Sequence, residues 1–242
     1  MEPPEGDHDE LHRSGSAGEH ALQCAYGTRE RAERFYADQV RDRLLPAMVE
    51  FVGRMEMLFV STADAGGECD ASLRAGPPGF IRVIDDRTLA YPEYRGNGVH
   101  ASLGNLAENG HVGLLMVDFV QDLIGLHVNG GARIVGDDDL RAAYPDLPHD
   151  IAYGRRAERW VVVDVDEAYI HCRKHIPQMQ RVTTRRSWGT DDPARKGGDY
   201  FAAKGTPARV PARPRPRRPF PATTHLGGGS ARTLRPRRDG SA

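Results

Sequence analysis

A glycine-rich loop in the first half of the chain could hold an anion. Residues 95–98, Arg-Gly-Asn-Gly, separate an apolar run from a segment with helical periodicity that starts at Val99. The first turn of a helix presents unpaired backbone N–H groups and the positive end of the helix dipole, which suit a phosphate group. Arg95 adds a fixed positive charge whose planar fork can bind two oxygens at once. The residue types and spacing therefore predict a phosphate site around Arg95, Gly96 and Asn97.

Four more polar residues could complete this site. Ser72 and Arg74 are two apart in a predicted strand, so their side chains face the same side. Ser102 and Asn105 are three apart in the predicted helix and share one of its faces. Taken singly, such an arginine is more often a surface charge, and such a serine more often packs within its helix. Together with the loop, the four residues favour a site for the phosphate of a ligand.

Histidines at two places could contact a ligand. His127 alternates with Asn129 along a predicted strand, and His171 and His175 flank Cys172 at the end of another. A structural histidine is the more frequent case at each place. The His-Cys-x-x-His spacing supplies at most two ligands on one side of a strand end, and no second cluster completes four ligands. No metal site is therefore predicted.

The sequence lacks the motifs of the common nucleophilic and nucleotide-binding enzymes. It contains no Gly-x-Ser-x-Gly, no Walker loop and no Gly-x-Gly-x-x-Gly after a strand. No catalytic residue is therefore predicted from a motif.

Alternating and helical patterns predict a mainly β protein with flanking helices, of the α+β class. Strands are predicted at residues 57–62, 69–74, 80–84, 88–91, 111–118, 123–135 and 160–172. Helices are predicted at residues 28–54 with a break at Pro46, at 99–108 and at 137–143, and a short helix or turn at 174–181. Gly125, Gly130 and Gly131 predict a bulge or a close backbone approach. Short strands with few helices between them predict a closed, mainly antiparallel barrel.

The two ends of the chain differ in composition from the part between them. Residues 1–20 are acidic and polar, residues 191–204 are polar, and the tail beyond is rich in arginine and proline. Both ends are predicted to be disordered, flanking one domain at 21–190. From Gly205 to the end, nine arginines and one aspartate give a charge of +8, so the rest of the chain carries −9 within the total of −1. The domain therefore offers no basic face for specific binding of nucleic acid.

Composition also bounds the location of the protein. No apolar run approaches the ~20 residues that span a bilayer. The N-terminus lacks the apolar segment of a secretory signal. Three widely spaced cysteines argue against a disulfide framework. We therefore expect a cytoplasmic protein without membrane contact.

The segment 80–119 resembles the pyridoxamine 5'-phosphate oxidase-like proteins, the FMN-binding split β-barrels. The resemblance rests on the order strand, turn, strand, Tyr-Pro-Glu-Tyr-Arg-Gly-Asn-Gly loop, helix and strand, and it extends to residues 57–79 and 125–172. It implies a split barrel and a homodimer with FMN at the subunit interface. It also implies which residues contact the cofactor. Those for the phosphate are Ser72, Arg74, Arg95, Gly96, Asn97, Ser102 and Asn105; those near the flavin ring are Phe80, Tyr91, Pro92 and, from the neighbouring subunit, His127.

The same resemblance implies a flavoprotein oxidoreductase that acts on a small molecule, with the redox chemistry supplied by the flavin. It does not name the substrate. The Arg-rich C-terminal motif of true pyridoxamine phosphate oxidases is not recognisable here, so that activity is not expected. Deazaflavin F420 and haem stay open as cofactors, with His127, His171 or His175 as the axial ligand of a haem, and a non-catalytic flavin carrier stays open as well.

Overall fold

The computed structural model describes residues 14–147, 149, 154–182 and 188–207. The chain divides into two compact units, Met1–Lys196 and Gly197–Ala242. The described part of the second unit, residues 197–207, consists of turns and irregular backbone. For residues 1–13 and 208–242, the predicted disorder lies outside the described residues.

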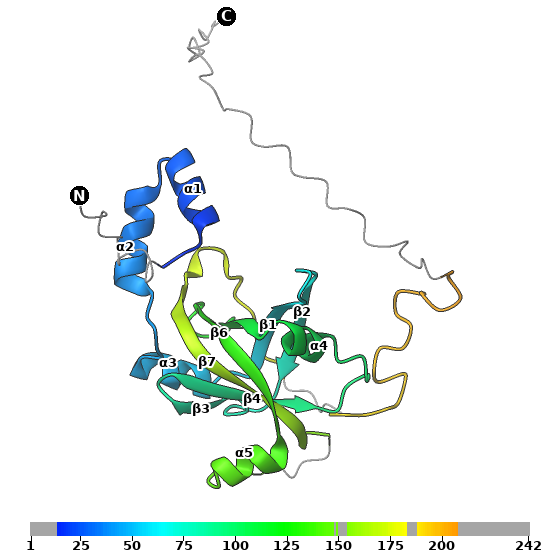
Figure 1. The fold of residues 1–242 in the computed structure, drawn as a ribbon. Coiled ribbons are helices and arrows are strands. Elements are labelled where there is room, and N and C mark those ends of the chain that lie inside the picture. Colours follow the sequence, from blue (N-terminus) through cyan, green and yellow to red (C-terminus); the bar gives the residue numbers. More distant parts are fainter. Residues whose placement is uncertain (1–13, 148, 150–153, 183–187, 208–242) are drawn as a thin grey trace, which may run out of the picture. The chain divides into compact units, whose positions relative to one another are not determined.

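The first unit is built on one antiparallel sheet with helices around it (Figure 1). Its helices are α1 (Ala17–Ala25), α2 (Arg29–Gln39), α3 (Pro46–Gly53), α4 (Ala101–Glu108), α5 (Asp137–Ala143) and the short 3-10 helix Arg173–His175. Its strands are β1 (Met57–Ala63), β2 (Cys69–Ala75), β3 (Arg82–Asp85), β4 (Thr88–Tyr94), β5 (His111–Val117), β6 (Gly125–Gly136) and β7 (Ala157–His171). Within the described residues, the seven strands follow the order β2-β1-β5-β6-β7-β4-β3. This arrangement confirms the α+β split-barrel prediction.

Hydrogen bonds do not close the barrel, because β2 and β3 are the two edges of the sheet and do not pair with each other. The predicted closure was therefore wrong at this one seam. β3 pairs with β4 only at Thr88–Ala90, so among the residues that the structure describes the second half of β4 has no strand neighbour on that side. The functional site described below lies at this open half of the seam.

The strands β4 and β7 separate two hydrophobic clusters. Tyr91 and Val161 belong to the main cluster inside the barrel, whereas Trp160 and Val162 belong to a second cluster under α5. The side chain of Asp137, at the start of α5, accepts a hydrogen bond of 2.8 Å from the indole N–H of Trp160. Both faces of β4 and β7 are thus buried here, which explains why apolar residues follow one another without alternation.

A bulge interrupts the pairing of β6 with β7 between Asn129 and Gly130, as the glycines predicted. A Cβ atom at Gly130 would collide with the backbone carbonyl of Asp164, so this residue must be glycine for the two strands to approach. The bulge lets β6 and β7 bend along their length, so that both strands contribute side chains to both hydrophobic clusters.

The linker between α2 and α3 differs from the prediction. α3 starts at Pro46 as predicted, but α2 ends at Gln39, and residues 40–45 are not helical. Arg41 forms a two-way backbone bridge with Ala168 of β7, with N···O distances of 3.0 and 2.7 Å, and the N–H of Leu44 donates to the carbonyl of Asp86. These distant partners outweigh local helix propensity, and Pro46 disfavours a helical Leu45.

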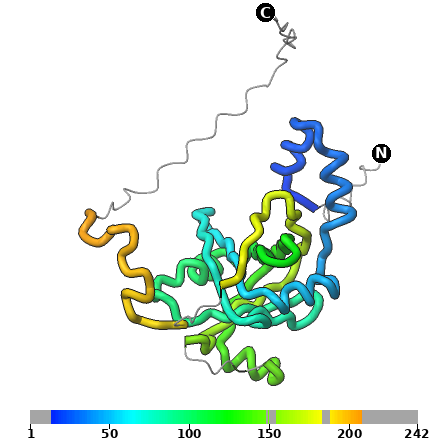
Figure 2. Tube along the Cα trace, turned by 180° about the vertical axis from the view of Figure 1, so that it is seen from behind, coloured from blue at the N-terminus to red at the C-terminus, as the bar shows by residue number. Residues whose placement is uncertain are grey.

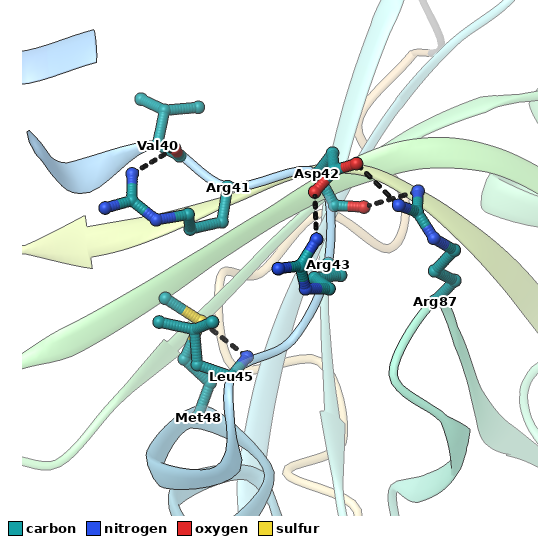
Figure 3. A network of polar contacts seen from close by, with 7 residues as sticks. All are labelled: Val40, Arg41, Asp42, Arg43, Leu45, Met48 and Arg87. Atoms are coloured by element: carbon teal, nitrogen blue, oxygen red, sulfur yellow. Dashed lines mark hydrogen bonds and ion pairs between the residues drawn. The ribbon is translucent and has the colours of Figure 1, made fainter. Parts of the chain in front are cut away.

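Polar side chains reinforce this linker, as Figure 3 shows. Arg87 donates to the carboxylate of Asp42 at 2.6 Å and to its backbone carbonyl at 3.1 Å. Arg43 pairs with the other oxygen of Asp42 at 3.2 Å. The β3–β4 turn, which carries Arg87, is thereby attached to the linker.

The helix α1 was not predicted, because residues 17–20 fall in the segment expected to be disordered. Ser16 caps it by accepting a hydrogen bond from the N–H of Glu19. The hydroxyl of Tyr36 on α2 donates to Glu19 at 2.7 Å, which joins the two helices into a hairpin. Phe35 of α2 meets Tyr169 edge-on, so the hairpin lies beside the end of β7, as seen from behind in Figure 2. Neither α1 nor α2 contributes a buried residue.

The described residues contain neither a membrane-spanning helix nor a cluster of metal-binding side chains. Among them, no helix has the length and the apolar character needed to cross a membrane. Within the same residues, no group of three or more His, Cys, Asp or Glu side chains is placed to hold a metal ion.

Candidate functional site

A pocket of about 480 Å³ lies at the open seam of the barrel. Its walls are the inner face of β2, the end of β4, residues 95–100 and the start of α4. The even positions of β2, from Asp70 to Arg74, face inward because successive side chains of a strand alternate between its faces. α4 packs against this inner face, as Figure 1 shows, and it places Ser102 directly over β2.

A directed chain of hydrogen bonds lines the pocket. Arg74 donates to the hydroxyl of Ser72 at 2.9 Å, and Ser72 lies 2.8 Å from the hydroxyl of Ser102. Ser102 donates to the carboxylate of Asp70 at 3.0 Å. Since the proton of Ser102 points to Asp70, Ser72 must be the donor between the two serines. The chain therefore runs from a cation to an anion, with two hydroxyls between them.

The guanidinium of Arg74 is also paired with Glu93 of β4. Its Nε and Nη2 atoms lie 2.8 and 2.7 Å from Oε1 of the carboxylate. The two side chains are 19% and 12% exposed, so the pair is largely shielded from water. A shielded pair of this kind orients both groups more firmly than a surface ion pair would.

The start of α4 carries no side-chain cap. His100 occupies the N-cap position in the left-handed region, with φ of 56°, and makes no capping hydrogen bond. The side chain of Asn97 accepts a hydrogen bond from the N–H of Val99 at 3.0 Å, outside the helix. The first N–H groups of α4 are thus left for a ligand or for water.

Arg95 lines the same pocket from its outer side. Its guanidinium lies 2.8 Å from the carboxylate of Asp191, and both side chains are about 60% exposed. An exposed pair of this kind is weak and exchanges easily. Arg95 is therefore a mobile charge at the mouth, whereas Arg74 is held at the base.

The structure brings six of the sequence-predicted residues together in this pocket: Ser72, Arg74, Arg95, Gly96, Asn97 and Ser102. Asn105 does not line it, because its amide donates to Thr62 of β1 and fixes α4 to the sheet. Pro92 and Phe80 line an adjoining cavity on the α5 side, which shares Tyr94 and Arg95 with this pocket.

Phe80 and Tyr91 are core residues, with exposed fractions of 3% and 0%. Little of either side chain is therefore exposed to a flavin ring in this protomer. The exposed apolar side chains at the pocket are Leu73 and Val99, which are 53% and 70% exposed. Val99, where the helical periodicity begins, is thus exposed, whereas Leu103 and Leu106 of α4 are buried.

The hydroxyl of Tyr91 has no hydrogen-bond partner among the described residues. Burial raises the pKa of this phenol, the carboxylate of Glu93 raises it further, and the charge of Arg74 opposes the rise. The hydroxyl therefore stays neutral and lies within the electrostatic influence of the Arg74–Glu93 pair.

His127 lies away from the pocket, on the outer face of the sheet. Its Nε2 atom is 3.0 Å from Nδ1 of His171, and its ring stacks on Tyr169 with centroids 4.7 Å apart. Burial lowers the pKa of His127, and the neighbouring His171 lowers it further. The ring is thus favoured in its neutral form.

Sequence reasoning missed the two carboxylates of the pocket. Asp70 is two residues before Ser72, so the alternation that identified Ser72 and Arg74 could also have identified Asp70. Glu93 could not be identified in this way, because β2 and β4 are not neighbours in the sheet.

The side chains and backbone of this pocket match the needs of a phosphate group. They offer two hydroxyls, one shielded guanidinium, one mobile guanidinium and the first N–H groups of α4. Asp70 and Glu93 compete with an incoming anion, because each accepts hydrogen bonds from these donors. A bound phosphate would therefore have to take Ser102 and Arg74 over from the carboxylates.

Comparison with known proteins gives one family match and several similar solved structures. The family model described as pyridoxamine 5'-phosphate oxidase matches residues 44–172. Among curated proteins, none matches the chain. HupZ from Group A Streptococcus is 24% identical, with a TM-score of 0.39 over 52% of this chain and 91% of that one. General Stress Protein 26 from Bacillus anthracis is 14% identical, with a TM-score of 0.36 over 55% and 95%.

A third solved structure is HutZ, the heme storage protein from Vibrio cholerae. It is 17% identical, with a TM-score of 0.36 over 53% of this chain and 95% of that one. The family match spans the sheet from the linker before α3 to the end of β7, which includes every strand described above. The chain therefore belongs to the pyridoxamine 5'-phosphate oxidase-like family.

Proposed function

We propose that this protein is an FMN-binding flavoprotein oxidoreductase. The observation that carries the proposal is the set of phosphate donors at one end of the barrel: Ser72, Ser102 and Arg74 converge beneath the uncapped start of α4. Family membership supports a flavin as the group to which this phosphate belongs. Arg95 would join the phosphate from the outer side by releasing Asp191.

The flavin, when bound, would supply hydride or electron transfer to a small-molecule substrate. The chain's own residues bind and orient it. Leu73 and Val99 offer apolar surface beside the phosphate donors, while Phe80 and Tyr91 support the site from within the core.

The proposal includes a homodimer. One row of cross-strand neighbours on the outer sheet face, termed the outer row, consists of Leu73, Phe59, Leu115, His127 and Tyr169. Phe59 is 40% exposed and Leu73 is 53% exposed. The exposed apolar side chains at the β1–β2 end of this row support a second copy of the chain as its cover. Leu73 also lines the pocket, so a partner on this face would complete the site.

We also place the protein in the cytoplasm. All three cysteines, Cys24, Cys69 and Cys172, are exposed and unpaired, which supports a reducing compartment.

The absorption spectrum of the purified protein tests the cofactor directly. FMN predicts a yellow protein with flavin absorption. Absorption at shorter wavelength would identify the cofactor as deazaflavin F420 instead of FMN, and a Soret band would identify it as haem. A yellow protein that stays oxidised with reduced nicotinamide cofactors and with a panel of reductants would instead be a flavin carrier.

A titration with FMN and with riboflavin then tests the phosphate site. Arg74→Gln should weaken FMN binding more than tenfold, the effect of losing about 1.5–3 kcal/mol from a charge-assisted hydrogen bond. Arg95→Ala should have a smaller effect, because its guanidinium is exposed. Arg133→Ala is the matched control, since Arg133 forms an exposed ion pair with Asp164 away from the pocket. Equal loss of riboflavin and FMN in Arg74→Gln would contradict the phosphate role.

A further inference from the structure

The hydroxyl of Tyr91 is the most unusual polar group in the described core. Tyr91 is fully buried, its ring belongs to the main hydrophobic cluster, and its hydroxyl has no partner among the described residues. An unpaired buried hydroxyl destabilises the folded protein, whereas phenylalanine would fill the same space without that penalty. The oxygen therefore calls for a functional explanation.

A candidate partner for this hydroxyl is Glu93, on the same strand. The two residues are two apart on β4, so both side chains point to the inner face of the strand. The charges of Glu93 and Arg74 both act on the phenol, so its hydroxyl lies within the field of the ion pair. In the described state Glu93 takes its hydrogen bonds from Arg74 instead.

Binding of a phosphate would change this distribution of donors. Arg74 uses Nε and Nη2 for Glu93 and Nη1 for Ser72. A phosphate held by Ser72 and Ser102 would lie next to the same guanidinium and would draw it away, because the phosphate carries the larger negative charge. Glu93 would then be left as a shielded carboxylate without its cation, which is a costly state.

We propose that the Tyr91 hydroxyl donates to Glu93 when Arg74 turns from Glu93 to a bound phosphate group. This exchange rests on the proposed function, because it needs a phosphate in the pocket. No proton leaves any residue and no covalent bond changes; one hydrogen bond replaces another. Tyr91 is thus a positioning residue for phosphate binding: it holds Glu93 back from the incoming anion and leaves Arg74 free to bind it.

The test uses Tyr91→Phe and Glu93→Gln in the full-length chain, singly and combined. Dissociation constants are measured for FMN and for riboflavin, which has the same ring without the phosphate. Thermal unfolding is measured without ligand. Tyr26→Phe, at the exposed end of α1, is the matched control for loss of a phenol oxygen.

The exchange predicts that Tyr91→Phe weakens FMN binding about tenfold, as expected for one hydrogen bond to a charged acceptor. Riboflavin binding should not change, and the ligand-free protein should unfold at the same temperature as the wild type or higher. In a Glu93→Gln background, Tyr91→Phe should no longer weaken FMN binding. The carboxylate to which the Tyr91 hydroxyl would donate is absent from that variant. Tyr26→Phe should behave as wild type.

Four outcomes would overturn the exchange. Equal FMN affinity of Tyr91→Phe and wild type, or an equal loss for FMN and riboflavin, would remove this role of Tyr91 and leave the proposed function standing. An effect of Tyr91→Phe that persists in Glu93→Gln would assign the hydroxyl to another acceptor. A wild-type protein that fails to bind FMN would remove the proposed function, and the exchange with it.

Discussion

Arg74 of β2 and Glu93 of β4 form an ion pair across two strands that share no backbone hydrogen bond. The pair bridges the seam where β3 no longer covers β4. It therefore joins the two sides of the split barrel and lies at the base of the candidate phosphate pocket at the same time.

This double role predicts opposite effects of Glu93→Gln on stability and binding. Without ligand, loss of the shielded carboxylate should lower the free energy of unfolding by roughly 1–3 kcal/mol, because Arg74 loses its partner. FMN affinity should rise several-fold, since one negative charge is removed beside the phosphate and the guanidinium is released. Urea unfolding and FMN titration of the same preparation measure both. A variant that lost stability and FMN affinity together would show that Glu93 helps to bind the ligand.

The bulge in β6 predicts different outcomes for two adjacent glycines. Gly130→Ala should lower the free energy of unfolding by about 2–4 kcal/mol, because the new methyl group collides with the carbonyl of Asp164. Gly131→Ala is the matched control, since the atom nearest its Cβ is 4.0 Å away. Urea unfolding with a common m-value measures both changes. Equal stability of the two variants would mean that β7 moves aside at Asp164.

The outer row predicts that polar substitutions separate the subunits. Phe59→Asp and Leu73→Asp should each shift the protein from dimer to monomer at micromolar concentration, because a carboxylate would be buried without a partner in the interface. Ile134→Asp is the control, because Ile134 is as exposed as Phe59 but lies outside the row. Sedimentation velocity measures the change. Wild-type protein that sediments as a monomer would remove the dimer from the proposed function.

The lowered pKa of His127 predicts that the protein loses stability in weak acid. Its pKa in the folded protein lies below the ordinary value of 6.5, through burial and the nearby His171. Below about pH 6.5 the unfolded chain therefore binds a proton that the folded chain does not. The free energy of unfolding decreases as the pH is lowered from there, until the pKa of His127 in the folded protein is reached. His127→Gln should flatten this part of the profile, and His111→Gln, which changes an exposed histidine, should not. Urea unfolding of the wild type and both variants is measured between about pH 7.5 and 5, on either side of the ordinary histidine pKa.

Much of the architecture could be predicted from local pattern. The strands follow from short apolar runs bounded by turns, α4 from its helical spacing, and the bulge from Gly130. The linker at 40–45 could not be predicted, because its partners Ala168 and Asp86 are distant in the sequence. Periodicity describes one element at a time and cannot show which strand a segment will meet.

The same distinction applies to the candidate site. Spacing of two and three residues found Ser72, Arg74 and Ser102, which do meet in the pocket. It could not assign Tyr91, because β4 is buried on both faces and neighbouring apolar residues look alike. Glu93 was missed because its importance comes from a contact across the seam rather than from its neighbours in the chain.

The backbone bridge of Arg41 to Ala168 also bears on where a truncated chain should begin. The family match begins at residue 44, so Arg41, which forms the bridge to Ala168, lies just before it, whereas Leu44, whose N–H donates to the carbonyl of Asp86, is its first residue. Neither α1 nor α2 buries a side chain. A truncated chain that begins at Val40 would thus keep both attachments, whereas one cut at the family boundary would leave the edge of β7 at Ala168 open to self-association.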